Sequence, residues 1–149
     1  MADRTSSSTI VKAPRTTVMG IIADIPTYPE WAGGVRSGEV VESWPDGRPR
    51  QVRLVLDAGF IKDTFVLLYD WEADTQVCWQ LVEATTVLSA LTGCYLLADH
   101  DGGTEVRYEI TVGLRIPMIG MLKRRAEKMI IDSALKGLKK HAENIGDAQ

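Results

Sequence analysis

Apolar and polar residues alternate along the middle of this chain, whereas the apolar residues near its C-terminal end recur at helical spacing. The alternating part consists of six runs separated by turn residues, over 35–44, 51–56, 61–71, 77–83, 88–98 and 105–114. In the last run the apolar positions are Val106, Tyr108, Ile110 and Val112. A period of two with turn signals between the runs is typical of antiparallel strands that bury one face. The pattern therefore predicts a meander of six strands.

Three shorter elements are expected before this meander. Residues 9–13 are rich in β-branched and apolar side chains, which favours a strand. Pro14 then stands where a helix would open, since proline is frequent at the first helical position. A second helical turn is expected over residues 27–31, and the Gly33-Gly34 pair would end it.

After the meander the sequence predicts one long helix that opens at Pro117. Its apolar and small residues would share one face: Ile119, Leu122, Ala126, Met129, Ile130, Ser133, Leu138 and Ala142. A helix of about 25 residues is roughly 38 Å long, so we expect it to lie across the whole sheet. The other face is basic, and Glu127 and Asp132 are the acids that lie on it. Its cationic residues are Lys123, Arg124, Arg125, Lys128, Lys136, Lys139 and Lys140.

This order of elements predicts an α+β domain in which a curved antiparallel sheet of about seven strands wraps around the long helix. Consecutive strands should be neighbours, and the first strand should pair with the last strand of the meander. A twisted sheet of this size tends to curl, and a helix about 10 Å wide does not fill the hollow. The remaining space is either packed by large side chains or left as an apolar pocket, and both readings stay open. We expect one domain over residues 1–149, with an ordered core from about residue 5 to 143.

Composition narrows the function classes. The chain has 149 residues, of which 45% are hydrophobic and 25% charged, and its formal net charge is -3. A dedicated nucleic-acid binder is usually basic, so we expect no nucleic-acid partner. Residues 1–8 show no apolar stretch, and no run approaches the roughly 18 apolar residues of a membrane span, so a cytoplasmic protein is predicted.

Cysteine and histidine usage argues against a metal site. Cys78 and Cys94 lack a CxxC spacing, and His100 lies far from His141 in the sequence. We therefore expect no metal and no cofactor, and two free thiols as in most intracellular chains. Both cysteines nevertheless fall on the outward face of consecutive strands and could lie opposite each other. A Cα separation above about 7 Å would exclude a disulfide.

No catalytic pair stands out in the sequence. The serines lack a histidine partner. Among the acids Asp57, Asp70, Glu83 and Glu109 none is compelling as an acid–base group, since Asp70 and Glu109 point out of the expected pocket and Glu83 sits at a strand end. The inward polar groups are the hydroxyls of Tyr69, Tyr95 and Tyr108, with Arg53 or Arg115 at the rim. Buried tyrosines also need partners for structural reasons alone. Gly93, at an inward position, either makes room for a neighbouring ring or marks a bulge.

Several short motifs carry a family resemblance when taken in order. They are Ile10-Val11-Lys12-Ala13-Pro14, Ile22-Ala23-Asp24, Tyr28-Pro29-Glu30-Trp31, Trp79-Gln80-Leu81-Val82-Glu83, Gly93-Cys94-Tyr95, Gly102-Gly103-Thr104-Glu105-Val106 and Ile116-Pro117. The chain resembles the START-like helix-grip (SRPBCC) superfamily, in particular its polyketide cyclase/dehydrase and coenzyme Q-binding-like branch. The resemblance implies a deep hydrophobic pocket between helix and sheet. Members bind lipids, quinones, polyketides or hormones, and only some are enzymes, so the fold does not fix the function.

The first prediction is therefore a protein that binds or carries a hydrophobic small molecule without acting on it. A polyketide cyclase, aromatase or dehydratase is the alternative, and a protein–protein interaction module with a collapsed pocket is the second alternative. The expected ligand-binding residues are Trp31, Leu54, Phe65, Leu67, Tyr69, Trp71, Trp79, Tyr95, Tyr108, Ile119, Leu122, Ala126, Met129 and Ile130. Trp31 would plug one end of the pocket.

The basic helix face leaves two further partners open. Beside the mouth of a pocket it could rest on an anionic membrane during lipid exchange, or it could simply be a solvated surface. A homodimer through the sheet edges or the basic helix is also left open.

Overall fold

Seven antiparallel strands form one sheet in the order β1-β7-β6-β5-β4-β3-β2. The structure is a computed structural model that describes residues 4–57, 62–115 and 120–147. The strands are β1 (Thr5–Val11), β2 (Val35–Ser43), β3 (Pro49–Asp57), β4 (Lys62–Glu72), β5 (Gln76–Leu81), β6 (Leu88–His100) and β7 (Gly103–Leu114). The helical elements are α1 (Arg15–Ala23), the short 3-10 turn η1 (Ile25–Thr27), α2 (Tyr28–Trp31) and α3 (Gly120–Asp147).

The strand order confirms the predicted meander and the predicted partner of the first strand. Strands β2 to β7 follow one another in the sheet, and β1 pairs with β7 from Thr5↔Ile110 to Val11↔Thr104. The first strand begins at Thr5, earlier than the apolar pattern indicated. The pattern missed this start because the first half of the strand contains serines and no apolar residue. Pro14 lies at the N-cap of α1 with extended backbone, so it precedes the helix rather than opening it.

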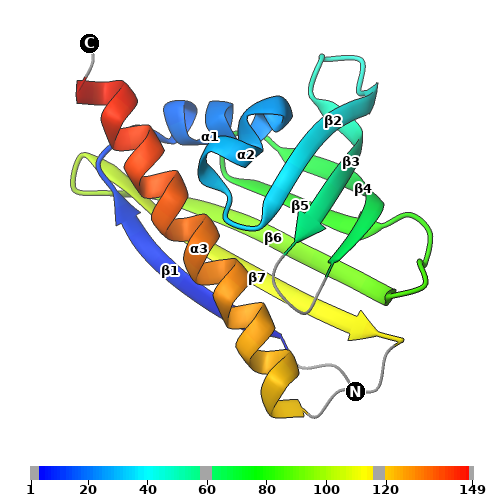
Figure 1. Ribbon diagram of the computed structural model, residues 1–149. Coiled ribbons are helices and arrows are strands. Elements are labelled where there is room, and N and C mark those ends of the chain that lie inside the picture. Colours follow the sequence, from blue (N-terminus) through cyan, green and yellow to red (C-terminus); the bar gives the residue numbers. More distant parts are fainter. Residues whose placement is uncertain (1–3, 58–61, 116–119, 148–149) are drawn as a thin grey trace.

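Helix α3 lies along the β1–β7 side of the sheet instead of covering the whole of it. Figure 1 shows its long diagonal course in front of β1 and β7, with α1 and α2 beside its C-terminal half. Its 28 residues correspond to about 42 Å. The concave face of β3, β4 and β5 is therefore left to η1, α2 and the space beneath them.

The rotation of α3 differs from the expected face at two positions. Met129 is 41% exposed, whereas Glu127, expected on the basic face, is only 1% exposed. The helix buries Ala126, Glu127, Ile131, Ala134, Leu135, Leu138 and Ala142. Ile119 lies outside the described residues, as does the side chain of Leu122. The sequence did not determine which face of the helix is buried, because Met129 and Ile131 lie on different faces and both faces contain apolar residues.

Helix α2 touches α3 through a glycine. A Cβ atom added at Gly137 would lie 1.7 Å from the carbonyl oxygen of Trp31, so only glycine permits this approach. This contact closes one end of the space between α3 and the sheet. Within the described residues, no helix is long and apolar enough to cross a membrane.

Candidate ligand pocket

An apolar cavity of about 70 Å³ lies between the inner face of the sheet and the helices. Strands β2 to β7 supply most of its walls, helix α3 contributes two residues, and α2 and the turn after it close one side. The lining residues are Tyr28, Ala32, Gly33, Val35, Leu54, Leu56, Phe65, Leu67, Tyr69, Trp79, Leu88, Leu91, Tyr95, Tyr108, Ile110, Val112, Ile130 and Ala134. None of these side chains carries a charge at neutral pH.

Trp79 is the centre of an aromatic wall in this cavity. Its ring centroid lies 5.5 Å from that of Tyr69, 5.4 Å from that of Tyr95 and 5.6 Å from that of Tyr108. The sheet register produces the cluster, because Tyr69 pairs with Trp79 across β4 and β5, and Tyr95 pairs with Tyr108 across β6 and β7. Such offset and edge-to-face contacts stabilise an aromatic cluster beyond simple burial.

Gly93 makes room for this tryptophan. It is the register partner of Trp79, and a Cβ atom at this position would lie 2.7 Å from the indole ring. Of the two roles expected for this inward glycine, the structure supports space for a neighbouring ring. The β5–β6 register continues without a shift through this pair, so no bulge is present there.

The four tyrosines of the chain all place their hydroxyls in this core. The Tyr28 hydroxyl donates to the Ile22 carbonyl oxygen at 2.5 Å and lies 3.5 Å from the Tyr69 hydroxyl. Because a phenol has one proton to donate, Tyr69 is the donor in the second contact. Among the described residues, none lies within hydrogen-bonding reach of the Tyr95 or Tyr108 hydroxyl. These two hydroxyls are therefore among the polar groups that the cavity offers to a ligand.

Burial keeps these phenols neutral. It raises the pKa of Tyr69 to about 12, although the hydrogen bond with Tyr28 acts in the opposite direction. Burial raises the pKa of Tyr28 and Tyr95 well above the usual range and raises that of Tyr108 as well, with smaller contributions from neighbouring tyrosines. Near neutral pH each can donate one hydrogen bond, and none can act as a base.

Many of the residues predicted from the sequence meet in this cavity. The predicted residues that line it are Leu54, Phe65, Leu67, Tyr69, Trp79, Tyr95, Tyr108 and Ile130. Strand parity was sufficient to identify all of them except Ile130, because one face of each strand points inward.

The remaining predicted residues lie elsewhere. Trp31 packs edge-on against Tyr28 at 5.0 Å, behind the cavity wall, and its buried indole nitrogen has no partner among the described residues. Trp71 lies toward the β3 end of the sheet, where its indole donates to the Pro49 carbonyl oxygen. Ala126 is buried but does not line the cavity, and Met129 is exposed.

Other lining residues were missed by sequence reasoning. Tyr28, Ala32 and Gly33 come from α2 and the turn after it, and only the contact of α2 with α3 brings them to the sheet. The others are Val35, Leu56, Leu88, Leu91, Ile110, Val112 and Ala134. The sequence pattern did indicate that Ile110 and Val112 point inward, because both alternate with polar residues in the same way as Tyr108.

The expected rim arginines do not border the cavity. Arg53 is exposed and pairs with Glu39 at 2.6 Å, and Arg115 is exposed. The acids Asp57, Asp70, Glu83 and Glu109 are likewise absent from the lining residues. In the described part of the chain, no group of three or more His, Cys, Asp or Glu residues could hold a metal ion.

The two cysteines form a disulfide on the outer face of the sheet, which corrects the expectation of free thiols. Cys78 and Cys94 are register partners on β5 and β6, with Cα atoms 4.1 Å apart. The predicted outward placement of both residues on neighbouring strands is confirmed. Spacing alone could not show that the two strands pair in this register.

Comparison with known proteins finds one matching family model and several similar solved structures. A family model described as polyketide cyclase / dehydrase and lipid transport matches residues 2–143. No curated protein matches the chain. Among solved structures, a START superfamily protein from Mycobacterium smegmatis is similar with a TM-score of 0.86 at 19% identity, over 95% of this chain and 98% of that one.

Two further solved structures support the same fold. The Zhui aromatase/cyclase from Streptomyces sp. R1128 has a TM-score of 0.80 at 15% identity, over 96% of this chain and 94% of that one. A protein from Thermus thermophilus has a TM-score of 0.80 at 21% identity, over 96% of this chain and 99% of that one. At these identities the likeness confirms the predicted helix-grip fold and carries no function with it.

Proposed function

Since this chain belongs to the polyketide cyclase/dehydrase and lipid transport family of START-like proteins, we propose that it binds a hydrophobic small molecule in the cavity beside Trp79. The observation that carries the proposal is a pair of hydroxyls on the cavity wall, those of Tyr95 and Tyr108, that make no hydrogen bond with the described residues. A ligand that excluded water from these hydroxyls without offering them an acceptor would bear a cost of about 1–3 kcal/mol. A ligand oxygen would remove this cost.

The chemistry of the wall specifies the kind of ligand. The aromatic and aliphatic lining favours rings or alkyl chains, and the neutral phenols favour an oxygen that accepts hydrogen bonds. A carbonyl or quinone oxygen fits this description, because it accepts without needing to donate. A carboxylate does not fit, since no cationic side chain is among the described residues that line the cavity.

The cavity must enlarge to hold such a ligand. Its 70 Å³ is well below the roughly 300–1,000 Å³ of pockets for drug-sized molecules. Only Ile130 and Ala134 of the described part of α3 line it, so a displacement of the helix moves a small part of the wall. The Trp79 ring, which packs against Gly93, is the larger group that we expect to move.

Binding without chemistry is the function we favour for this cavity. A cyclase or dehydratase needs a group that moves a proton near neutral pH. None of the described lining side chains can take up a proton as a base near neutral pH, because the phenols stay protonated. The similar Zhui aromatase/cyclase keeps a cyclase as the alternative. Turnover of a poly-β-keto substrate that is lost in Tyr95→Phe would establish that alternative.

Native mass spectrometry of the protein purified from its own host tests the proposal directly. We expect a bound apolar molecule that solvent extraction releases. In vitro, a hydrophobic fluorescent ketone should bind, and Tyr95→Phe or Tyr108→Phe should each weaken it about five- to tenfold. A pure hydrocarbon probe of the same size is the matched control and should bind all variants equally. Absence of binding by both probes would favour the interaction module with a collapsed pocket.

Peripheral membrane contact through α3 is a separate proposal about delivery of the ligand. Arg124, Arg125, Lys136 and Lys140 are exposed on this helix. Lys139 is engaged elsewhere, because its ammonium group donates to the Ile10 carbonyl oxygen and to Glu143. Co-sedimentation with anionic vesicles should be lost at high salt, and salt-independent or absent binding would contradict the proposal. Sedimentation velocity would detect a homodimer.

Cytoplasmic location, predicted from the sequence, is also kept as a proposal. The disulfide bears on it, because disulfides persist mainly in oxidising compartments and are often transient or redox-sensing in the cytosol. Fractionation of the host with alkylation of thiols at lysis would report the location and the cysteine state together.

A further inference from the structure

We propose that the Cys78–Cys94 disulfide is a thiol–disulfide exchange site on the outer face of the sheet, and that its redox state controls the packing of Trp79 in the cavity wall. The first half concerns a reaction with dithiols that is independent of any ligand. The second half rests on the proposed function, because it assigns the reaction an effect on the ligand cavity.

The disulfide lies in an open groove. A hollow of about 590 Å³ on the outer face includes both cysteines among its lining residues, together with Trp44, Gln76 and Thr92. Cys78 and Cys94 are both half-buried rather than enclosed. A small thiol can therefore approach either sulfur from solvent without unfolding the sheet.

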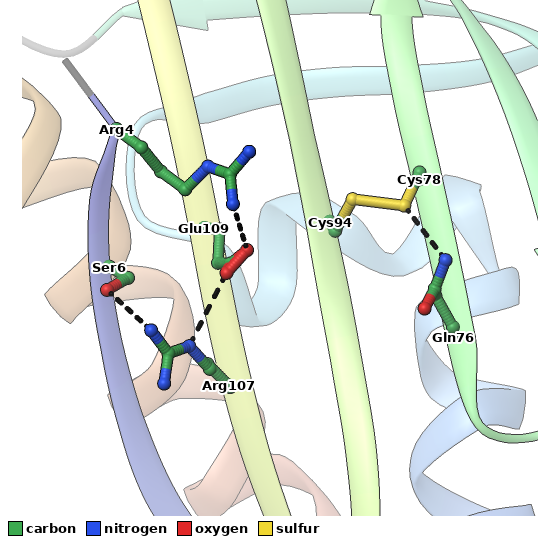
Figure 2. A network of polar contacts seen from close by, with 7 residues as sticks. All are labelled: Arg4, Ser6, Gln76, Cys78, Cys94, Arg107 and Glu109. Carbon is green, nitrogen blue, oxygen red and sulfur yellow. Dashed lines mark hydrogen bonds and ion pairs between the residues drawn. A yellow bond between two sulfur atoms is a disulfide. The ribbon is translucent and has the colours of Figure 1, made fainter.

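Charges around the groove do not repel an incoming thiolate. Glu109 is the register partner of Cys94, and Asp70 is the register partner of Cys78. Figure 2 shows Glu109 between two guanidinium groups, with Arg4 at 3.2 Å and Arg107 at 3.4 Å. Arg4 lines the groove together with Asp70 and Glu109, and Arg107 pairs with Glu109 from outside the lining, so the two arginines offset the charges of the two acids.

Gln76 distinguishes the two sulfur atoms. Its side-chain amide donates to the Cys78 sulfur at 3.4 Å, as Figure 2 shows. An attacking thiolate would bond to the Cys94 sulfur, and the S–S electron pair would pass to Cys78, whose thiolate the amide stabilises as the leaving group. In the mixed disulfide, the second thiol of the reductant then attacks the reductant sulfur that is bonded to Cys94, and Cys94 leaves as a thiolate. In total the protein disulfide gains two electrons and two protons, and the dithiol becomes a disulfide.

The next register pair connects this site to the cavity. Trp79 follows Cys78, Gly93 precedes Cys94, and these two residues are paired directly across β5 and β6. Trp79 lines both the outer groove and the inner cavity. The disulfide therefore clamps the two strands one residue away from the point where the indole lies on Gly93.

Reduction removes this clamp while the backbone pairing of two central strands remains. We expect the sheet to persist and the β5–β6 ladder to open more often, which allows the Trp79 ring to move away from Gly93. Since the cavity must grow to accept a ligand, the reduced protein should bind a bulky hydrophobic probe more tightly than the oxidised protein. About fivefold is the lower end of the usual coupling between two sites.

The exchange is tested on the folded protein with glutathione redox buffers and then with dithiothreitol. Thiols are trapped with iodoacetamide and counted by mass spectrometry, and far-UV circular dichroism checks that the fold persists. We expect both cysteines to be alkylated while the protein stays folded. Gln76→Leu should slow the reduction about three- to tenfold, as expected for loss of one hydrogen bond, and Thr92→Ala, in the same groove, should not. A disulfide that resists reduction until the protein unfolds would overturn the proposal.

The coupling is tested by near-UV circular dichroism and by binding of N-phenylnaphthylamine in both redox states. We expect an altered aromatic signal and tighter probe binding on reduction. Cys78→Ser/Cys94→Ser should reproduce both, whereas Trp79→Phe should lose most of the spectral change. An unchanged aromatic signal would refute the coupling. If the probe binds in neither state while the aromatic signal does change, the proposed ligand function fails and the redox coupling stands.

Discussion

The side-chain carboxyl of Glu127 accepts a hydrogen bond from the backbone N–H of Val112 at 3.0 Å, deep between α3 and β7. Its other oxygen accepts from the Thr5 hydroxyl at 2.9 Å. Val112 lies two residues beyond Ile110, where the described pairing of β7 with β1 ends. A helix side chain thus supplies the acceptor at the end of the ladder and joins α3 to two strands.

Replacement of Glu127 by alanine should destabilise the fold by about 2–3 kcal/mol. The change leaves a buried N–H without its acceptor and opens a small space, and both effects favour unfolding. Urea denaturation measures the difference. Glu105→Ala, at an exposed position of β7, is the control and should stay within about 0.5 kcal/mol of the parent protein. Equal effects of the two substitutions would contradict the structural role of Glu127.

Two helical glycines should respond in opposite directions to alanine. Gly137→Ala should destabilise by about 2–3 kcal/mol or more, since the new methyl group would meet the Trp31 carbonyl oxygen. Gly20→Ala should stabilise by about 0.5–1 kcal/mol, because nothing lies within 4 Å of the added Cβ and alanine favours helix. Thermal denaturation of both variants checks the pair. A tolerated Gly137→Ala would show that α2 does not rest on α3 at this point.

The aromatic wall should be sensitive to a single methyl group at Gly93. Gly93→Ala places a Cβ 2.7 Å from the Trp79 ring, so the indole must move and the cluster must repack. We expect a loss of about 1–3 kcal/mol and a changed near-UV circular dichroism spectrum. The adjacent outward substitution Thr92→Ala should leave that spectrum unchanged. An unaltered spectrum in Gly93→Ala would place the ring elsewhere.

Stability should decline at alkaline pH because of the tyrosines. In the folded state burial raises the pKa of Tyr69 to about 12, whereas an unfolded tyrosine has a pKa near 10. Between these values the unfolded chain loses the proton that the folded chain keeps, so rising pH favours unfolding. The contribution is fully present below about pH 10 and is lost as the pH approaches 12.

Ultraviolet absorbance of tyrosinate and circular dichroism, followed in one pH titration, check this expectation. All four tyrosines of the chain are buried, so tyrosinate should appear together with loss of structure. Tyr69→Phe should make the decline in stability shallower. Ionisation of tyrosines with a pKa near 10 in a folded protein would contradict the buried cluster.

The alternation of apolar and polar residues was enough to predict the sheet and one wall of the pocket. Alternation assigns each strand residue to a face, because successive side chains point to opposite sides of a strand. It therefore placed Tyr69, Trp79, Tyr95 and Tyr108 together on the inner face, and Cys78 and Cys94 together on the outer one. The short connections between consecutive strands determined which strands are neighbours, since a tight turn can join only adjacent antiparallel strands.

The way in which the helices pack on this sheet could not be predicted from local patterns. The rotation of α3, which turns Glu127 inward and Met129 outward, depends on contacts with strands far away in the sequence. The contribution of Tyr28 to the cavity depends on the backbone approach at Gly137. Cavity volume depends on side chains from several elements at once. The periodicity of a sequence indicates to which side of an element each side chain points, but it contains no information on the distances between elements.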